Sequence, residues 1–171
     1  PMAALPLMAG LTGREVLQGM VDGLLPYPPI GATLDFEGFE VGDDFVAVTA
    51  RAQDFHYNPI GVVHGGVIAT LLDTAAGCAV HATLDAGVAY TSLDLVTKFL
   101  RPMTLDSGRV RAEGRVLHRG SRTALAAATL VDTKAVKGTT DDVVTDTRQI
   151  LHPAATHEHD RVLLEVVTFT T

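Results

Sequence analysis

Residues 56–77 read HYNPIGVVHGGVIATLLDTAAG, and this stretch decides the fold. A polar, turn-rich segment ends at His64-Gly65-Gly66, and an uninterrupted run then extends from Val67 to Leu84. This run is apolar on most of its helical circumference, and a helix of that kind is buried. The small residues at 75–79 would let a sheet approach it closely. We therefore expect one long, buried central helix.

Strand-like segments lie on both sides of this helix. Residues 30–52 alternate as strands do, with a break at Gly42-Asp43-Asp44 that is typical of a hairpin turn. Three more segments follow at 89–100, 108–118 and 122–132, the last two joined by a short glycine-containing link. Consecutive strands without helices between them form an antiparallel sheet. The predicted fold class is α+β, with a curved antiparallel sheet wrapped around the central helix.

The two ends of the chain are expected to lie outside this core. Residues 12–25 carry one apolar stripe at helical spacing, with Thr12 as a cap, and predict a short helix. Residues 134–159 lack periodicity and predict a surface excursion, whereas 162–170 alternate as a closing strand would. The predicted division is 1–28 for the helix and arm, 29–133 for the core, and 134–171 for the excursion and possible closing strand.

Composition excludes several classes of protein. The chain has 171 residues, 47% of them hydrophobic and 19% charged, which favours one globular domain over a disordered chain. A net charge of −7 argues against general nucleic-acid binding. The single cysteine, Cys78, excludes an intrachain disulfide and a thiolate-rich zinc site, and no other residues suggest a metal. Since no apolar run is long enough to span a membrane, we expect a soluble, cytoplasmic protein without a membrane partner.

Two features of the central helix could carry chemistry. Gly65 and Gly66 lie where the helix begins, so their backbone N–H groups and the positive helix end would point at a docked ligand. A tight loop-to-helix turn would also explain this glycine pair. Asp73 lies between Leu72 and Thr74 inside the apolar run, where a carboxylate is costly unless it is paired, solvated in a cleft or used. A satisfied, purely structural carboxylate is the alternative.

The spacing of these residues predicts how a site could assemble. Asp73 follows Gly65 by eight positions, which is about 12 Å along one helix. A base and an oxyanion donor must both lie about 3 Å from the reacting group, so one chain cannot easily supply both. Two antiparallel helices related by a twofold axis can do so. We therefore expect a homodimer with shared active sites.

Three motifs together resemble a known family. They are the 56–77 stretch, SLDLVTKFLRP at 92–102, and RVLHRGSRTALAAATLVD at 115–132. The chain resembles the hotdog-fold acyl-CoA thioesterases, of the phenylacetate-pathway type within the 4-hydroxybenzoyl-CoA thioesterase superfamily, over about residues 30–133. The resemblance implies that Asp73 attacks the thioester carbonyl or activates a water, while Gly65 and Gly66 polarise the carbonyl. It also implies an acyl-CoA substrate, aromatic first and medium-chain second, no cofactor, and a dimer or a tetramer of two dimers.

The resemblance implies further roles, each with a plain alternative. Asn58 falls where the family often has a polar side chain near the thioester, but it also suits a turn before Pro59. His64 could position the site, although capping of the helix start is the better explanation. Ser92 matches a position that often carries threonine and could reach the catalytic water, or it could simply bond to the backbone.

A basic stretch could bind the phosphates of coenzyme A. Seven of the thirteen basic residues fall between 98 and 122, against only Asp106 and Glu113 there. Cationic side chains are expected near phosphates. Arg119 and Arg122, which flank Gly120-Ser121, are the chosen binding residues, with a solvated strand face as the alternative.

Two other functions fit the same fold. A ligand-sensing hotdog module would bind acyl-CoA without cleaving it, but such a module does not need Asp73 in an apolar helix. The hydratase branch of the fold typically carries a histidine and a carboxylate together early in its helix motif, and that pairing is absent here.

Overall fold

The computed structural model describes residues 5–132 and 165–170. Its elements in chain order are α1 (Leu5–Met8), α2 (Gly13–Val21), α3 (Pro29–Thr33), β1 (Phe36–Val41), β2 (Val46–Arg51), the 3₁₀ turn η2 (Asp54–His56), α4 (Gly65–His81), β3 (Ala89–Leu95), the 3₁₀ turn η3 (Leu105–Ser107), β4 (Arg109–Arg119), β5 (Thr123–Asp132) and β6 (Glu165–Thr170).

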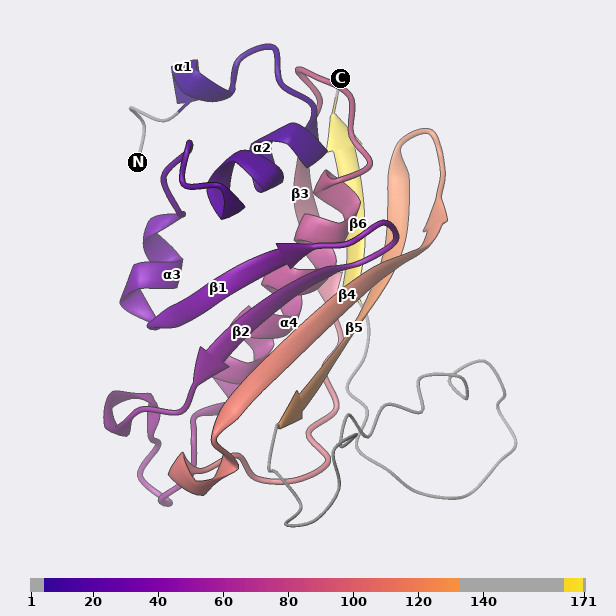
Figure 1. The fold of residues 1–171 in the computed structure, drawn as a ribbon. Helices are drawn as coiled ribbons and strands as arrows, with labels where there is room; N and C mark the ends of the chain where they lie inside the picture. The colour runs from indigo at the N-terminus through magenta and orange to yellow at the C-terminus, as the bar shows by residue number, and fades with distance from the viewer. Residues whose placement is uncertain (1–4, 133–164, 171) are drawn as a thin grey trace, which may run out of the picture.

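In the described part of the chain, one antiparallel sheet of six strands surrounds the long helix. The strand order is β1-β2-β4-β5-β6-β3, and every neighbouring pair is antiparallel. Figure 1 shows β1, β2 and β4 crossing in front of α4 while β3 and β6 lie behind it. Helix α4 contacts β2, β3, β4, β5 and β6. This arrangement confirms the predicted α+β hotdog fold.

The core lies between α4 and the inner face of the sheet. Leu71, Ala75 and Val80 of the helix are completely buried. The sheet comes closest where the helix carries small residues: a Cβ added at Gly114 of β4 would lie 2.2 Å from the backbone oxygen of Ala75. The glycine is therefore required by close packing, and the predicted close approach of the sheet is confirmed.

The N-terminal segments only partly follow the sequence prediction. Helix α2 begins as expected, since the Thr12 hydroxyl accepts a hydrogen bond from the Glu15 N–H at 3.3 Å and the Glu15 carboxylate accepts one from the Thr12 N–H. The prediction of a strand from residue 30 is wrong, because Pro29–Thr33 form α3. Pro29 occupies the first turn, where its fixed φ favours a helix and its missing N–H costs nothing.

Two other segments differ in extent from their predictions. Strand β3 ends at Leu95, whereas the alternation predicted a strand to residue 100. In the C-terminal region β6 lies between β5 and β3 and pairs with both, within the segment 162–170 that was expected to form a strand. Residues 1–4 and 162–164 lie outside the described residues, and so does the predicted excursion at 134–159.

Candidate active site

Asp73 lies on the face of α4 that the core leaves uncovered. Its side chain is partly exposed, and the Ser92 hydroxyl of β3 donates a hydrogen bond to Asp73 Oδ1 at 3.0 Å. Its helix neighbours Thr70 and Thr74 donate their hydroxyls to backbone oxygens of the preceding turn, at 2.8 and 2.6 Å. These hydroxyls are engaged within the helix, so among the described residues the ordering contact of Asp73 is the one from Ser92.

The start of α4 corrects one expectation about the glycine pair. His64 is the N-cap, and its Nδ1 accepts a hydrogen bond from the Gly66 N–H at 2.9 Å. The Gly66 amide is therefore occupied, and the capping role weighed for His64 is the one observed. Within the described part of the chain, no acceptor is recorded for the Gly65 N–H. Gly65 is thus the amide at this helix end that can still receive a ligand oxygen.

The structure does not bring Gly65 and Asp73 together within one chain. Both residues lie on the same continuous helix, eight positions apart. At about 1.5 Å per residue the separation along the axis is about 12 Å, too far for one reacting group to contact both. A site that uses both residues must take them from two chains.

Asn58 and the buried His56 are held by local backbone contacts. Asn58 Oδ1 accepts hydrogen bonds from the N–H groups of Ile60 and Val62, at 3.1 and 3.3 Å, so it organises the turn as its alternative reading proposed. His56 is 3% exposed, and its Nδ1 accepts a hydrogen bond from the Gln53 N–H at 3.1 Å. Its Nε2 lies 3.1 Å from the Leu34 oxygen. Both ring nitrogens are occupied, which suits a structural role.

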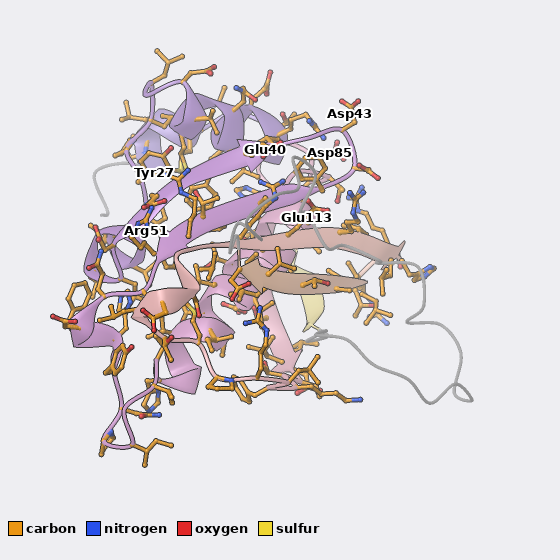
Figure 2. All side chains as sticks on the ribbon, turned by 60° about the horizontal axis from the view of Figure 1, so that its bottom comes forward. Tyr27, Glu40, Asp43, Arg51, Asp85 and Glu113 are labelled. Atoms are coloured by element: carbon orange, nitrogen blue, oxygen red, sulfur yellow. The ribbon has the colours of Figure 1, made fainter. Side chains whose placement is uncertain are left out.

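Much of the basic stretch on β4 is neutralised by acidic side chains. Arg109 pairs with Glu37 of β1 at 2.5 Å, and Arg111 pairs with Glu40 at 2.6 Å. Figure 2 labels Glu40 on β1 and Glu113 on β4, on either side of β2. Arg115 pairs with Glu113 at 2.8 Å and also with Asp44. Arg101 pairs with Asp132 at 2.7 Å. The positive region expected from the sequence is therefore largely an ion-paired surface.

Of the two chosen arginines, Arg119 is the last residue of β4 and Arg122 lies in the turn between β4 and β5. The turn is closed by a hydrogen bond from the Gly120 N–H to the Thr123 oxygen at 2.8 Å, while Ser121 and Arg122 are exposed. Strand β4 runs along α4, since Val110 lines a pocket with Ile68 near the helix start and Gly114 meets the helix at its middle. The turn therefore lies beyond the C-terminal end of α4, away from Gly65 of the same chain.

His81 closes α4 at that end. Burial lowers the pKa of its imidazole below the ordinary 6.5, because the protein interior disfavours the charged form. Its ring lies against that of Tyr90 on β3, with 5.3 Å between ring centroids. The neutral form is therefore favoured in the folded protein.

Sequence reasoning missed the apolar residues that surround the start of α4. One groove beside Gly66 and Thr70 includes Ile30, Leu34 and Phe55 from the N-terminal side. On another side Phe99 packs against the helix, where a Cβ added at Gly65 would lie 3.1 Å from its ring. The structure identifies these residues by their exposure: Ile30 is 45% exposed, Phe55 65% and Phe99 56%, and bulky apolar side chains on a surface often mark contacts.

The described residues contain no group of three or more His, Cys, Asp or Glu side chains that could hold a metal ion. Over the same residues, no helix has the length and apolar character that crossing a membrane requires.

Comparison with known proteins agrees with the fold. The family model described as "Thioesterase superfamily" matches residues 60–139, which include α4. A curated protein of Halobacterium salinarum named "Putative esterase" is 40% identical over 73 residues, 42% of this chain and 46% of that protein. The match spans only about half the length of the curated relatives, at 46% and 56%.

Two solved structures share the architecture. A phenylacetic acid degradation-related protein of Ralstonia eutropha JMP134 has a TM-score of 0.65 at 22% identity, covering 90% of this chain and 97% of that one. A thioesterase of Haemophilus influenzae has a TM-score of 0.66 at 19% identity, covering 90% of each chain. Residues 60–139 thus match the thioesterase superfamily model, and the two solved structures share the hotdog fold that surrounds these residues.

Proposed function

We propose that this protein is an acyl-CoA thioesterase that hydrolyses the thioester to a free acid and coenzyme A. The observation that carries the proposal is Asp73, a carboxylate on the open face of an otherwise apolar helix, ordered by the Ser92 hydroxyl at 3.0 Å. A positioned carboxylate can serve as a general base or as a nucleophile.

The proposed chemistry needs only water as a second reactant. As a general base, Asp73 takes a proton from water, the resulting hydroxide adds to the thioester carbonyl, the carbon–sulfur bond breaks, and the departing thiolate takes the proton from Asp73 to leave as the thiol. As a nucleophile, Asp73 itself adds to the carbonyl, the carbon–sulfur bond breaks to release the thiolate, and water hydrolyses the resulting acyl anhydride to the free acid and the Asp73 carboxylate. In either route the Gly65 N–H stabilises the negative carbonyl oxygen. No cofactor takes part.

The separation of the two groups supports a dimer with shared sites. Gly65 of the partner subunit would face Asp73 of this chain across two antiparallel α4 helices. Support comes from β3, which ends the described sheet and carries Leu93 with 60% exposure, followed by Val96 with 49%. An apolar edge strand of this kind favours pairing with a second chain. We extend the proposal to a tetramer of two such dimers.

In the same dimer, Arg119 and Arg122 at the β4–β5 turn would lie near the substrate. Antiparallel helices place the C-terminal end of one α4 near the N-terminal end of the other. Arg119 and Arg122 would then bind the phosphates of a coenzyme A whose thioester lies near Gly65 of the partner subunit. We propose aromatic acyl groups first and medium-chain groups second, since the Ralstonia protein with the same fold is described as phenylacetic acid degradation-related. A cytoplasmic location fits the single cysteine.

The test is a hydrolysis screen with free-thiol detection. Purified protein is incubated with phenylacetyl-, hydroxybenzoyl-, hexanoyl- and acetyl-CoA, and thiol release is followed over time. The proposal expects release that saturates with substrate for at least one aromatic or medium-chain thioester. Tight binding of these compounds without thiol release would instead establish the ligand-sensing module.

A further inference from the structure

Two hollows border the first turns of α4. The first, here the α3 groove, has a volume of about 430 Å³ and is largely open to solvent. Its walls come from α3, η2 and the start of α4, through Ile30, Leu34, Phe55, His56, Tyr57, His64, Gly66, Val67 and Thr70. The second, here the β5 hollow, includes Ile68, Phe99, Leu100, Met103 and Leu130. Both hollows offer apolar side chains to a group bonded to a carbonyl at Gly65.

The α3 groove lies on the same side of the helix as Asp73. Gly66, Thr70 and Asp73 follow one another at spacings of four and three residues, which places them on one helix face. Ile68 points the other way and is 7% exposed. The β5 hollow is further separated from Gly65 by the Phe99 ring. The α3 groove is therefore the space that a substrate at this helix face reaches directly.

The lining of the α3 groove favours an uncharged ligand. No Asp, Glu, Lys or Arg is among the described residues that line it. Its polar side chains are engaged: the Tyr57 hydroxyl accepts a hydrogen bond from the Leu105 N–H at 2.8 Å, and both nitrogens of His56 meet backbone groups. A charged acyl end would lose its hydration here without gaining a partner. In contrast, the rim of the β5 hollow carries the Arg101–Asp132 ion pair.

Helix α3 is held firmly enough to act as a wall. The buried His56 ring binds the Leu34 oxygen through Nε2, and the Gln53 amide donates a hydrogen bond to Asp35 at 2.9 Å. These contacts join the end of α3 to the turn that precedes α4. The wall residues Ile30, Leu34 and Phe55 all precede residues 60–139, the part of the chain that matches the thioesterase superfamily.

We propose that the α3 groove binds the acyl group of the substrate and that Ile30 is a specificity-determining residue. The groove selects uncharged apolar acyl groups of hexanoyl to phenylacetyl size over acyl groups that end in a carboxylate. This inference rests on the proposed thioesterase function. It assigns acyl selection to an N-terminal segment outside the family match, while the reacting groups belong to α4.

The experiment fills the groove from its exposed wall. In Ile30→Trp the larger side chain occupies acyl space, and because Ile30 is 45% exposed the fold tolerates the change. Leu24→Trp is the matched control, since Leu24 is 78% exposed and does not line the groove. Leu100→Trp tests the β5 hollow. Values of kcat/KM are measured for acetyl-, hexanoyl-, phenylacetyl- and glutaryl-CoA.

We expect Ile30→Trp to lower kcat/KM for hexanoyl- and phenylacetyl-CoA by about tenfold or more, with acetyl-CoA changed by less than about twofold. Leu24→Trp and Leu100→Trp should show the same kcat/KM values as the unmodified protein. Glutaryl-CoA should be a poor substrate for the unmodified protein and for all three variants. An equal loss on all substrates with Ile30→Trp, efficient use of glutaryl-CoA, or a change of acyl preference only in Leu100→Trp would overturn the inference.

A binding arm separates this inference from the proposed hydrolysis. S-hexyl-CoA, a thioether that cannot be hydrolysed, is titrated calorimetrically against the unmodified protein and Ile30→Trp, with coenzyme A as reference. The groove predicts that the hexyl group tightens binding and that Ile30→Trp removes about tenfold of that gain. If no acyl-CoA is hydrolysed, the thioesterase proposal fails, and this titration alone tests whether the α3 groove binds the acyl group. If Ile30→Trp leaves the affinity gained from the hexyl group unchanged, the groove proposal is refuted.

Discussion

The two faces of α4 differ more than the composition of the helix suggests. The face toward the sheet is apolar and closed, with Leu71 and Ala75 completely buried. The opposite face carries Gly66, Thr70 and Asp73, all at least partly accessible. One face therefore stabilises the fold, and the other is left for a ligand or a second chain. The contrast shows why a single charged residue in an apolar helix is informative only when its face is known.

The closed face should give the largest effect on stability. Leu71→Ala removes a completely buried side chain next to the sheet and should lower the free energy of unfolding by about 2–5 kcal/mol. Thr70→Ala, on the open face, should change it by less than about 0.5 kcal/mol. Urea unfolding followed by circular dichroism measures both. Similar losses for the two variants would remove the distinction between the faces.

The open face should give the largest effect on activity. Asp73→Asn keeps the size of the side chain but removes the base, and turnover of acyl-CoA should fall by about two orders of magnitude. The unfolding midpoint should stay close to that of the unmodified protein, because Asp73 is partly exposed. Asp85→Asn, an exposed carboxylate beyond the end of α4, is the control and should retain full turnover. Near-normal turnover in Asp73→Asn would reject Asp73 as the reacting carboxylate.

Substitution of the arginines proposed to bind the phosphates of coenzyme A should have a smaller effect, confined to substrate binding. Arg119→Ala or Arg122→Ala should raise KM for acyl-CoA several-fold with little change in kcat, because phosphate contacts hold the ground state and the transition state equally. Short thioesters that lack the nucleotide should be insensitive to the change. Steady-state kinetics on both substrate types provides the readout, and an equal loss on both would assign these arginines to the fold.

His81, at the C-terminal end of α4, should make the free energy of unfolding weakly dependent on pH. Burial lowers the pKa of His81 in the folded protein, so the unfolded chain binds a proton at a higher pH than the folded chain does. The contribution of His81 to stability is therefore complete above its ordinary pKa of 6.5 and declines as the pH falls from there toward the lower folded value. Urea unfolding at pH 8 and pH 5 should show a smaller acid-induced loss in His81→Asn than in the unmodified protein. The exposed His118→Asn should not alter this loss.

The sequence predicted what depends on local pattern. The long helix followed from the apolar run after Gly66, and the sheet followed from alternation and turns. The short helix α3 was not predicted, because the alternation of apolar residues from residue 30 onward favours a strand and Pro29 in the first turn is a weaker signal. Its role as a wall depends on the contact of His56 with Leu34, 22 positions away.

The site was predicted in its residue types and missed in its contacts. Asp73 and Ser92 were separate candidates, and only the packing of β3 beside α4 joins them across 19 positions. The arginines of β4 were expected to form a positive region, but strand register brings Arg109 and Arg111 to acids of β1 that precede them by about 70 positions. Such pairs depend on tertiary structure, although the acidic residues of β1 indicate in the sequence that ion-pair partners for the arginines are available.

The central claim is that one active site takes Asp73 from one chain and Gly65 from its partner. The most direct measurement mixes two inactive variants, Asp73→Asn and Gly65→Val, by unfolding and refolding them together and assaying acyl-CoA hydrolysis. A shared site restores one intact centre in each mixed dimer, and random pairing then gives about a quarter of the wild-type activity. The refolded mixture should reach this level while each variant refolded alone stays inactive. A mixture no more active than its parents, with mixed dimers demonstrated by differently tagged chains, would contradict the account.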